Sequence, residues 1–355
     1  MKEPRVPVTL LTGFLGAGKT TLLNAVLSDN SAGRVAVIVN EFGEAGLDHD
    51  LIEESSEEII LMRSGCLCCS VRGDLSKTIS DLFERRTQKE IAFERIVIET
   101  TGLADPGPIL QTLLVDNFLA KNTRMDGVVT VVDAAHAAVP LDAQFEAVSQ
   151  AAMADLIVLS KTDLVNLADV ESLEIRLYGL NPGITIIRSI LGKGLFGKLW
   201  GLSALHNNAS KQQALNWTVG EKPQFEALAN LSGFAPAAQI SAPLPAHDTR
   251  IGSASIILDD PLPDAAFDLW LDTLISIRGP DILRVKGILF LEGIEAPFVI
   301  HGVQHIFAPP VQLKDWSKED RRTRIVIIAR DLSRPDLQRS LDMLRVRATE
   351  PALAS

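Results

Sequence analysis

Apolar residues in the first 205 positions form short unbroken runs that alternate with stretches of helical spacing. Unbroken runs of strand length are typical of strands that are buried on both faces of a parallel sheet. Between residues 71 and 86, the apolar side chains Leu75, Ile79, Leu82 and Phe83 instead recur at the spacing of an amphipathic helix. The pattern predicts an α/β fold with an open, mostly parallel, doubly wound sheet. The predicted strands are 6–12, 34–40, 95–102, 127–132, 155–159 and 184–187.

A second pattern begins after residue 250. From residue 206 to about 250 the periodicity fades and Asn, Ser, Gly and Pro accumulate, which is typical of a linker, with a helix predicted near 225–231. Beyond the linker, charged side chains such as Arg284 and Lys286 interleave with apolar ones inside the predicted strands. This alternation indicates an antiparallel sheet with one solvent-exposed face and helices on the other. We predict a first domain at 1–205, a linker at 206–250, a smaller α+β domain at 251–346 and a tail at 347–355.

Composition narrows the class of protein. With 355 residues, of which 46% are apolar and 22% charged, the chain is long enough for two globular domains and too apolar for a disordered protein. Its net charge of −11 argues against a nucleic-acid partner, because phosphate backbones attract clustered Lys and Arg. No stretch approaches 18 uncharged apolar residues, so we expect neither a membrane span nor a signal peptide. The expected location is the cytoplasm.

The first predicted strand leads directly into a glycine-rich loop. Residues 13–20 read GFLGAGKT and precede a predicted helix at 21–27. Glycines let successive backbone N–H groups point at an anion, and the following helix directs the positive end of its dipole to the same place. Lys19 can then reach the terminal phosphates of a nucleoside triphosphate, and the Thr20 hydroxyl can bind Mg²⁺. The predicted nucleotide contacts in this loop are Gly13, Gly16, Ala17, Gly18, Lys19, Thr20 and Thr21.

Two later motifs complete the predicted nucleotide site: one lies at the carboxyl end of the predicted strand 95–102, and the other follows the predicted strand 155–159. The Glu99 carboxylate can hold Mg²⁺, and the Gly102 N–H can meet a γ-phosphate. In the second motif, the Asp163 carboxylate can accept hydrogen bonds from N1–H and the exocyclic amine of guanine, while the Lys161 stem lies along the base. Adenine offers no such pair of donors, so this motif favours GTP over ATP; a solvent-exposed helix cap is the alternative for Asp163. The candidate catalytic residues are Lys19, Thr20 and Glu99.

All three cysteines of the chain, Cys66, Cys68 and Cys69, lie within four residues of one another. Three thiolates suit a tetrahedral thiophilic ion such as Zn²⁺, and Co²⁺ accepts the same geometry. Three thiolates leave the fourth coordination position of the metal without a cysteine ligand. Water, a carboxylate such as Glu41 or Glu44, or a ligand from a client protein could fill it. An open position suits transfer of the metal better than storage. The alternative is that the cysteines fill an apolar core.

The histidines form no comparable cluster in the sequence. His301 and His305 fall within one predicted strand and would share a face, which is more typical of a polar sheet face than of an auxiliary metal site. This region, 302–307, and the strand at 284–287 are the predicted surface for a client protein or for self-association of the chain.

Several motifs together resemble those of the CobW-type metallochaperone GTPases. They are GFLGAGKT at 13–20, NEFGE at 40–44, GCLCC at 65–69, ETTGLADP at 99–106, LRVKG at 283–287 and GVQHIF at 302–307, and they extend over nearly the whole chain. The continuation ADPGPI is most similar to the YjiA-like branch of the family. The resemblance implies a P-loop GTPase domain followed by a CobW C-terminal domain, slow intrinsic hydrolysis of GTP, Mg²⁺ at the phosphate loop, and Zn²⁺ at the cysteines.

Two departures from the family pattern affect the expected function. Ser160 stands where the guanine motif of the family usually begins with Asn, which predicts a weaker guanine preference. The chain also lacks the histidine-rich stretch of many members, so metal storage through such a tract is excluded.

The position of two segments suggests how nucleotide and metal are coupled. Residues 40–44 and 64–70 lie between the phosphate loop and Glu99, where P-loop GTPases place segments that order around the γ-phosphate and relax after hydrolysis. We therefore expect metal affinity to differ between the GTP and GDP states, with delivery to a client metalloprotein. Glu41 and Glu44 are also candidates for positioning the attacking water. The alternatives are an assembly scaffold in which nucleotide only controls docking, and a small-molecule kinase, against which the guanine motif argues.

Overall fold

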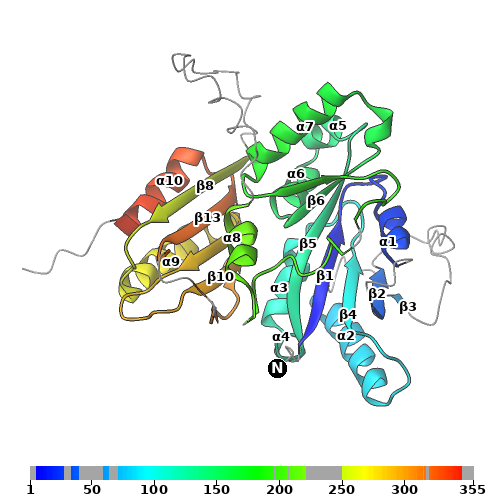
Figure 1. The fold of residues 1–355 in the computed structure, drawn as a ribbon, viewed down its shortest axis with the longest axis horizontal. Helices are drawn as coiled ribbons and strands as arrows, with labels where there is room; N and C mark the ends of the chain where they lie inside the picture. Colours follow the sequence, from blue (N-terminus) through cyan, green and yellow to red (C-terminus); the bar gives the residue numbers. More distant parts are fainter. Residues whose placement is uncertain are drawn as a thin grey trace, which may run out of the picture.

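The structure, a computed structural model, describes residues 5–27, 33–39, 59–63, 71–195, 197–206, 208–220, 250–314, 316 and 320–345. These residues form two sheets, each with its own helices, which lie next to each other (Figure 1). Helix α8 (Lys211–Val219) lies between the two sheets and falls within the region that we predicted as a linker. The helix predicted near 225–231 lies outside the described residues.

The first sheet has seven strands in the order β3-β2-β4-β1-β5-β6-β7. Every neighbouring pair in this order is parallel, which confirms the predicted doubly wound α/β fold. The strand order reverses next to β1, because β4 lies on one side of β1 and β5 on the other. The strands are β1 (Val6–Thr12), β2 (Val35–Val39), β3 (Ile59–Arg63), β4 (Arg95–Glu99), β5 (Thr123–Asp133), β6 (Leu156–Ser160) and β7 (Thr185–Arg188).

Both faces of this sheet are buried, which explains the unbroken apolar runs in the sequence. In β4, Ile96 and Ile98 join the cluster under one set of helices, while Val97 joins the cluster that includes Leu23 of α1 on the other face. Polar N-caps such as Asn166 of α7 accept hydrogen bonds from the first turn of a helix and fix where it begins. The helices are α1 (Lys19–Leu27), α2 (Val71–Thr87), α3 (Gly107–Val115), α4 (Asn117–Asn122), α5 (Ala138–Ala143), α6 (Phe145–Ala152) and α7 (Leu167–Leu180).

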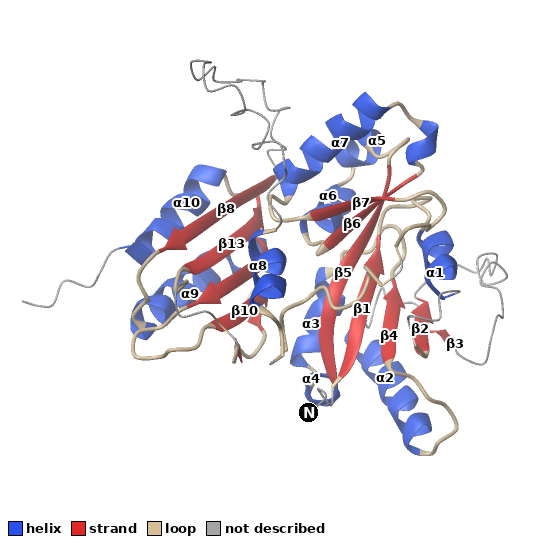
Figure 2. Ribbon diagram, viewed as in Figure 1, coloured by secondary structure: helices blue, strands red, loops and turns tan. Residues whose placement is uncertain are grey.

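The second sheet is antiparallel, with the order β11-β10-β9-β13-β8 and with β12 paired to β10. Helices α9 (Asp264–Arg278) and α10 (Arg334–Asp342) cover one face of it (Figure 2). The predicted antiparallel sheet with helices on one face is therefore confirmed. The strands are β8 (Ile251–Leu258), β9 (Ile282–Leu289), β10 (Phe298–Val303), β11 (Ile306–Phe307), β12 (Val311–Gln312) and β13 (Thr323–Arg330).

The other face of this sheet is not solvent-exposed, and here the prediction was wrong. Arg284 and Lys286 of β9 are only 1% and 7% exposed, because this face packs against α8 and the first domain. The strand at 284–287 is therefore not an open surface for a client protein. His301 of β10 is buried on the same face, whereas β10 ends at Val303 and His305 lies in a turn, so the two histidines do not share a strand face.

A buried cluster of charges joins the two domains. Arg284 donates to both carboxylate oxygens of Asp155 at 2.7 Å, and Lys286 Nζ lies 2.7 Å from Asp155 Oδ1. Lys286 also donates to the Trp217 carbonyl at 3.0 Å. Burial and the neighbouring Arg284 lower the pKa of Lys286 to about 8, more than attraction to Asp155 raises it. A single carboxylate thus compensates two buried cations at the domain interface.

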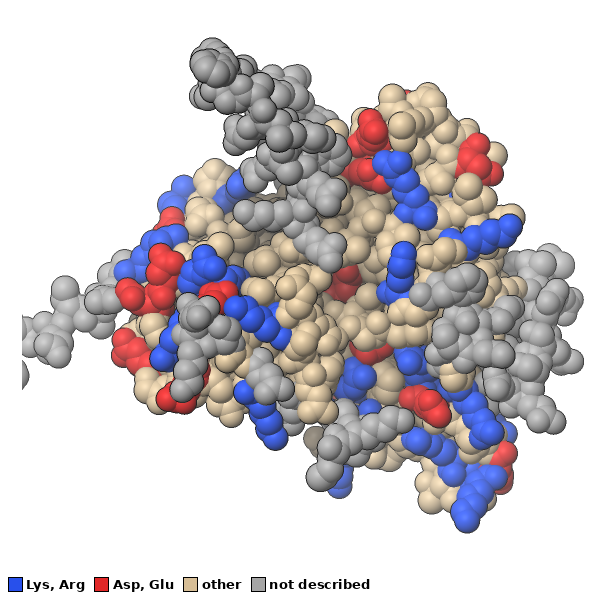
Figure 3. Space-filling model, in the orientation of Figure 1, with Lys and Arg blue, Asp and Glu red and all other residues tan. Residues whose placement is uncertain are grey.

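The outer surface carries charges of both signs. On the face drawn in Figure 3, Lys and Arg side chains are interspersed with Asp and Glu side chains over both domains. Among the helices of the described residues, none is long and apolar enough to cross a membrane.

We expect Asp155→Asn to lower the free energy of unfolding by about 3–5 kcal/mol, because it leaves two buried cations without their carboxylate. Lys286→Met is the matched control: it removes the surplus cation and keeps the pair between Asp155 and Arg284, so its cost is expected to be below about 1 kcal/mol. Urea denaturation of both variants measures the difference. An equal loss in the two variants would show that the carboxylate does not hold the interface.

Candidate functional site

The carboxyl ends of four neighbouring parallel strands lie in one row. Leu11 of β1 is in register with Glu99 of β4, Glu99 with Val39 of β2, and Val39 with Arg63 of β3. Adjacent strands lie about 4.8 Å apart, so Arg63 is roughly 10 Å from Glu99 along this row. The loops that follow these strands therefore emerge at one edge of the sheet, where ligands bind in doubly wound folds.

The glycine-rich loop after β1 has the backbone conformation that its glycines predict. Gly13, Gly16 and Gly18 have φ angles of 142°, 72° and 95°, a region that side chains with a Cβ rarely adopt. A Cβ on Gly13 would also lie 2.3 Å from the Val131 carbonyl oxygen of β5. Helix α1 begins immediately after the loop, at Lys19, so its N-terminal N–H groups face the loop.

Lys19, Thr20 and Glu99 meet at this loop. Lys19 Nζ donates to the carbonyl oxygens of Gly13 at 2.9 Å and Phe14 at 3.4 Å, which places the ammonium inside the loop. Thr20 Oγ1 donates to Glu99 Oε1 at 3.1 Å, and Glu99 is only 6% exposed. A hydroxyl and a carboxylate oxygen side by side are the hard oxygen donors that Mg²⁺ prefers, so these two residues fit that ion.

The segment after β4 packs directly on the glycine-rich loop. A Cβ on Gly102 would lie 2.5 Å from the backbone nitrogen of Leu15, so only glycine fits this contact. The buried Gln150 of α6 donates to the carbonyl oxygens of Gly102 at 3.1 Å and Ala104 at 3.0 Å and thereby holds the segment in place. We did not predict Gln150 from the sequence, because a glutamine inside an apolar helix carries no motif.

The guanine motif after β6 is tied to the same loop. Lys161, in a left-handed conformation with φ 55°, donates to the Gly16 carbonyl at 2.8 Å and forms an ion pair of 2.7 Å with Asp133 at the end of β5. The Ser160 hydroxyl donates to the Ala17 carbonyl at 2.6 Å. Asp163 lies in the short helix η3 (Thr162–Leu164) and is exposed.

Asp133 is a second residue of this site that we did not predict, although a carboxylate at the end of a neighbouring strand was an available signal. Burial opposes its ionisation, but hydrogen bonds from Lys161, His136 and the Ala135 N–H lower the pKa of Asp133 overall. Its carboxylate thus stays charged and holds the Lys161 ammonium over the loop.

The predicted metal ligands lie outside the described residues: Cys66, Cys68 and Cys69, together with Glu41 and Glu44. The described residues that flank the cysteine segment are Arg63, at the end of β3, and Val71, where α2 begins. Within the described ranges, no group of three or more His, Cys, Asp or Glu side chains could hold a metal ion. Of the remaining predicted contacts, Ala17 is buried in the loop and Thr21 is exposed on α1.

Comparison with known proteins identifies both domains. Residues 7–188 match the family described as CobW/HypB/UreG, nucleotide-binding domain, and residues 251–345 match the cobalamin synthesis protein cobW C-terminal domain. The chain is 32% identical to the zinc chaperone YjiA of Escherichia coli, over 96% of this chain and 99% of that protein. It is 30% identical to the zinc-regulated GTPase metalloprotein activator 1 of Schizosaccharomyces pombe, over 93% and 83% of the two chains.

Solved structures agree with the sequence relatives. The crystal structure of Zn(II)-bound YjiA GTPase from E. coli superimposes with a TM-score of 0.71 at 28% identity and covers 97% of this chain and 100% of that one. A zinc-bound triple mutant of YjiA gives the same values. The two domains thus follow one another in the order that the resemblance implied. The chain belongs to the CobW family of P-loop proteins.

Proposed function

We propose that this chain is a GTP-hydrolysing metallochaperone that binds Zn²⁺ at Cys66, Cys68 and Cys69 and delivers it to a client metalloprotein under control of the nucleotide. Membership of the CobW family makes the chain a P-loop GTPase. One observation supports control of metal binding by the nucleotide. Arg63, the described residue that precedes the cysteine segment, lies roughly 10 Å from Glu99 in the row of strand ends.

GTP binds, in this proposal, along the edge that carries the glycine-rich loop. The N–H groups of the loop and the Lys19 ammonium hold the phosphates, and Lys161 and Asp163 hold the base. The Ser160 hydroxyl already donates to the Ala17 carbonyl, so recognition of guanine depends on Asp163. Ser160 nevertheless links the guanine motif to the glycine-rich loop through this hydrogen bond, although it lacks the side-chain amide of the Asn that the family usually has at this position.

Hydrolysis requires positioning and neutralisation of charge rather than covalent chemistry by the protein. Thr20 and Glu99 would hold Mg²⁺, which would neutralise negative charge on the phosphates. Lys19 adds a second positive charge at the same phosphates, and the Gly102 N–H contacts the γ-phosphate. Because Gly102 also packs on Leu15, loss of the γ-phosphate changes the segment between Glu99 and Ala104.

The choice of metal in this proposal rests on the chemistry of the three thiolate ligands. Three thiolates bind Zn²⁺ or, with the same geometry, Co²⁺, and Glu44 is our candidate for the fourth ligand. The zinc chaperone YjiA and the zinc-regulated activator, both reported above as relatives, support zinc as the cargo. Val39 is in register with Glu99 and Arg63 with Val39, and these are the described residues that precede the two segments, which supports a response of both segments to the γ-phosphate.

Zinc affinity is expected to differ about 5- to 150-fold between a non-hydrolysable GTP analogue and GDP, because coupling between two sites is typically 1–3 kcal/mol. Competition with a chelator measures it. Lys19→Ala should bind zinc but lose the dependence on nucleotide, whereas the triple variant Cys66→Ser, Cys68→Ser, Cys69→Ser should lose tight binding.

Each outcome of this competition separates the proposal from its rival. Zinc affinity that is equal in both nucleotide states would leave an assembly scaffold, in which nucleotide only controls docking. Unchanged affinity in the cysteine variant would remove the metal site from this segment altogether.

Gly102→Ala should weaken binding of GTP by about 1–3 kcal/mol, roughly 5–150-fold, because the added methyl group forces the glycine-rich loop away from its contact at Leu15. The control is Gly179→Ala in α7, where a Cβ meets nothing within 4 Å and slight stabilisation is expected. Equilibrium dialysis with labelled GTP compares the two. Equal affinity in both variants would mean that this contact does not shape the site.

Asp163→Asn should reduce affinity for GTP about 10–100-fold and raise affinity for xanthosine triphosphate, because an amide can donate to the 2-oxo group of xanthine where a carboxylate cannot. Competition between the two nucleotides gives the ratio directly. If the wild-type and variant proteins had the same ratio of affinities for the two nucleotides, Asp163 would not be the residue that recognises the base.

A further inference from the structure

The antiparallel sheet of the second domain ends in a long strand whose outer edge has no neighbouring strand among the described residues. This strand, β8, pairs with β13 alone. Its eight residues, IGSASIIL, include no charged residue and no proline, although natural sheets protect their edges with such residues or with very short strands. At the opposite end of the sheet, β11 has only two residues. The edge of β8 is therefore the one suited to receive an added strand.

The register of β8 decides which of its backbone groups face outward. The Asp331 N–H donates to the Arg250 carbonyl oxygen at 2.9 Å, so these two residues form a hydrogen-bonded pair. Hydrogen-bonded and non-hydrogen-bonded pairs alternate along antiparallel strands, and the register with β13 continues unshifted to Leu258. Residues 251, 253, 255 and 257 therefore direct their N–H and C=O groups away from β13. No hydrogen bond joins these groups to another residue that the structure describes.

A groove of about 1180 Å³ lies along this edge. Ile251, Ser253 and Ser255 of β8 line one side, and Ile175 and Tyr178 of α7 line the other. Helix α7 lies next to β8 (Figure 2). The groove is larger than the roughly 300–1,000 Å³ of small-molecule pockets. From Ile251 to Ser255 the strand extends about 13 Å, which matches a peptide of about five residues in extended conformation.

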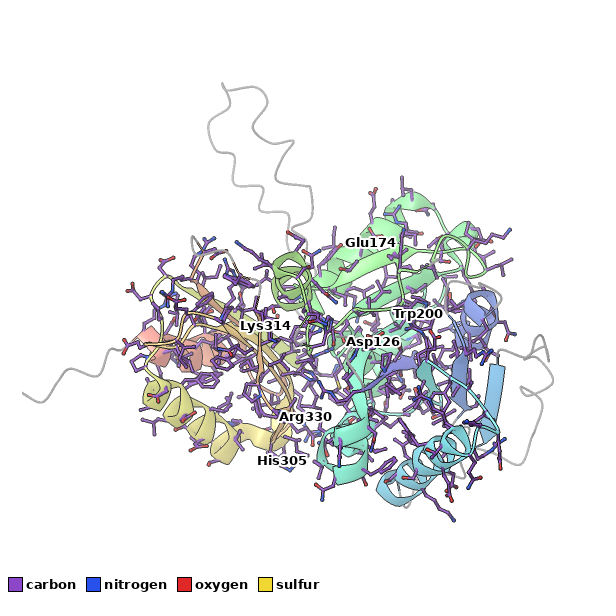
Figure 4. The ribbon with its side chains drawn as sticks, turned by 60° about the horizontal axis from the view of Figure 1, so that its bottom comes forward. Asp126, Glu174, Trp200, His305, Lys314 and Arg330 are labelled. Atoms are coloured by element: carbon purple, nitrogen blue, oxygen red, sulfur yellow. The ribbon has the colours of Figure 1, made fainter. Side chains whose placement is uncertain are left out.

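The charges that line the groove favour a basic residue in its ligand. Glu171 and Glu174 of α7 lie on one wall, and Glu174 is labelled in Figure 4. Arg188 donates to both carboxylate oxygens of Glu174, at 2.7 and 2.8 Å, so one guanidinium serves two carboxylates on this wall. On the opposite wall, Asp331 and Asp336 are balanced by Arg334 and Arg339. Among the described residues, one negative charge is therefore in excess.

We propose that the outer edge of β8 binds an extended peptide segment of a partner protein, which adds a sixth strand to the row that ends at β8. The backbone of the peptide pairs with the outward groups of Ser253 and Ser255. Aliphatic side chains at alternate positions of the peptide pack against Ile175 and Tyr178, and a Lys or Arg lies near Glu171. Main-chain pairing supplies affinity in this mode of recognition, and the side-chain contacts supply specificity.

The test uses the full chain and a fluorescent pentapeptide that alternates valine with lysine and threonine, titrated by fluorescence polarisation. Two N-methylated forms are compared, one modified on the second and fourth residues and one on the third and fifth. Successive N–H groups of a strand face opposite edges, so only one form loses the bonds to β8, and the two affinities should differ at least about tenfold. Replacing lysine by glutamate should weaken binding about 2–5-fold.

Equal affinity of the two methylated forms would mean that the peptide binds without pairing its backbone, and would overturn the proposal. No saturable binding of the parent peptide at millimolar concentration would overturn it as well. Self-association of the chain at this edge, without peptide binding, would assign the edge to a second copy instead of a partner protein.

Three variants locate the binding site. Ser255→Pro removes an outward N–H inside the groove and keeps the pairing with β13, so affinity should fall at least about tenfold. Ile257→Pro is the matched control, because its N–H also faces outward but it is not among the residues that line the groove. Gly179→Trp, at an exposed position of α7 where a Cβ meets nothing within 4 Å, should block the groove from the other wall. Peptide binding that survives Gly179→Trp unchanged would place the peptide elsewhere, whether or not the proline variants fold.

Discussion

Parallel pairing of β1 with β4 is the constraint on which the nucleotide site depends. Because Leu11 and Glu99 are in register, the loop after β1 and the carboxylate at the end of β4 meet at one sheet edge. The hydrogen bond from Thr20 to Glu99 and the contact of Gly102 with Leu15 both follow from this pairing. Pairing of β2 and β3 on the same side then brings the start of the cysteine segment to that edge.

The domain interface is linked to the same edge by short strands. Asp155, which pairs with Arg284 and Lys286, directly precedes β6, and β6 ends at Ser160, whose hydroxyl contacts the glycine-rich loop. Five residues of strand, about 16 Å, therefore separate the buried ion cluster from the guanine motif. The buried ion cluster and the contact of Ser160 with the glycine-rich loop thus lie at the two ends of one short strand.

Much of this fold and the centre of this site could be predicted from the sequence, but the partners of individual side chains could not. The apolar runs predicted the strands because both faces of the parallel sheet are covered. The alternation at Arg284 and Lys286 predicted a solvent-exposed face, and this prediction was wrong, because the first domain covers that face and supplies the carboxylate of Asp155. Gln150 and Asp133 escaped prediction because their roles come from contacts with other elements.

The sequence by itself determined what depends on a few neighbouring residues: the strand and helix periods, the glycine-rich loop with its positive φ angles, and the clustering of the three cysteines. Tertiary structure decided which side chains meet across long separations, such as Thr20 with Glu99, 79 residues apart, and Arg284 with Asp155, 129 residues apart. The physical reason is that backbone dihedrals and side-chain spacing are local properties. Strand order and domain docking are set by burial over the whole chain.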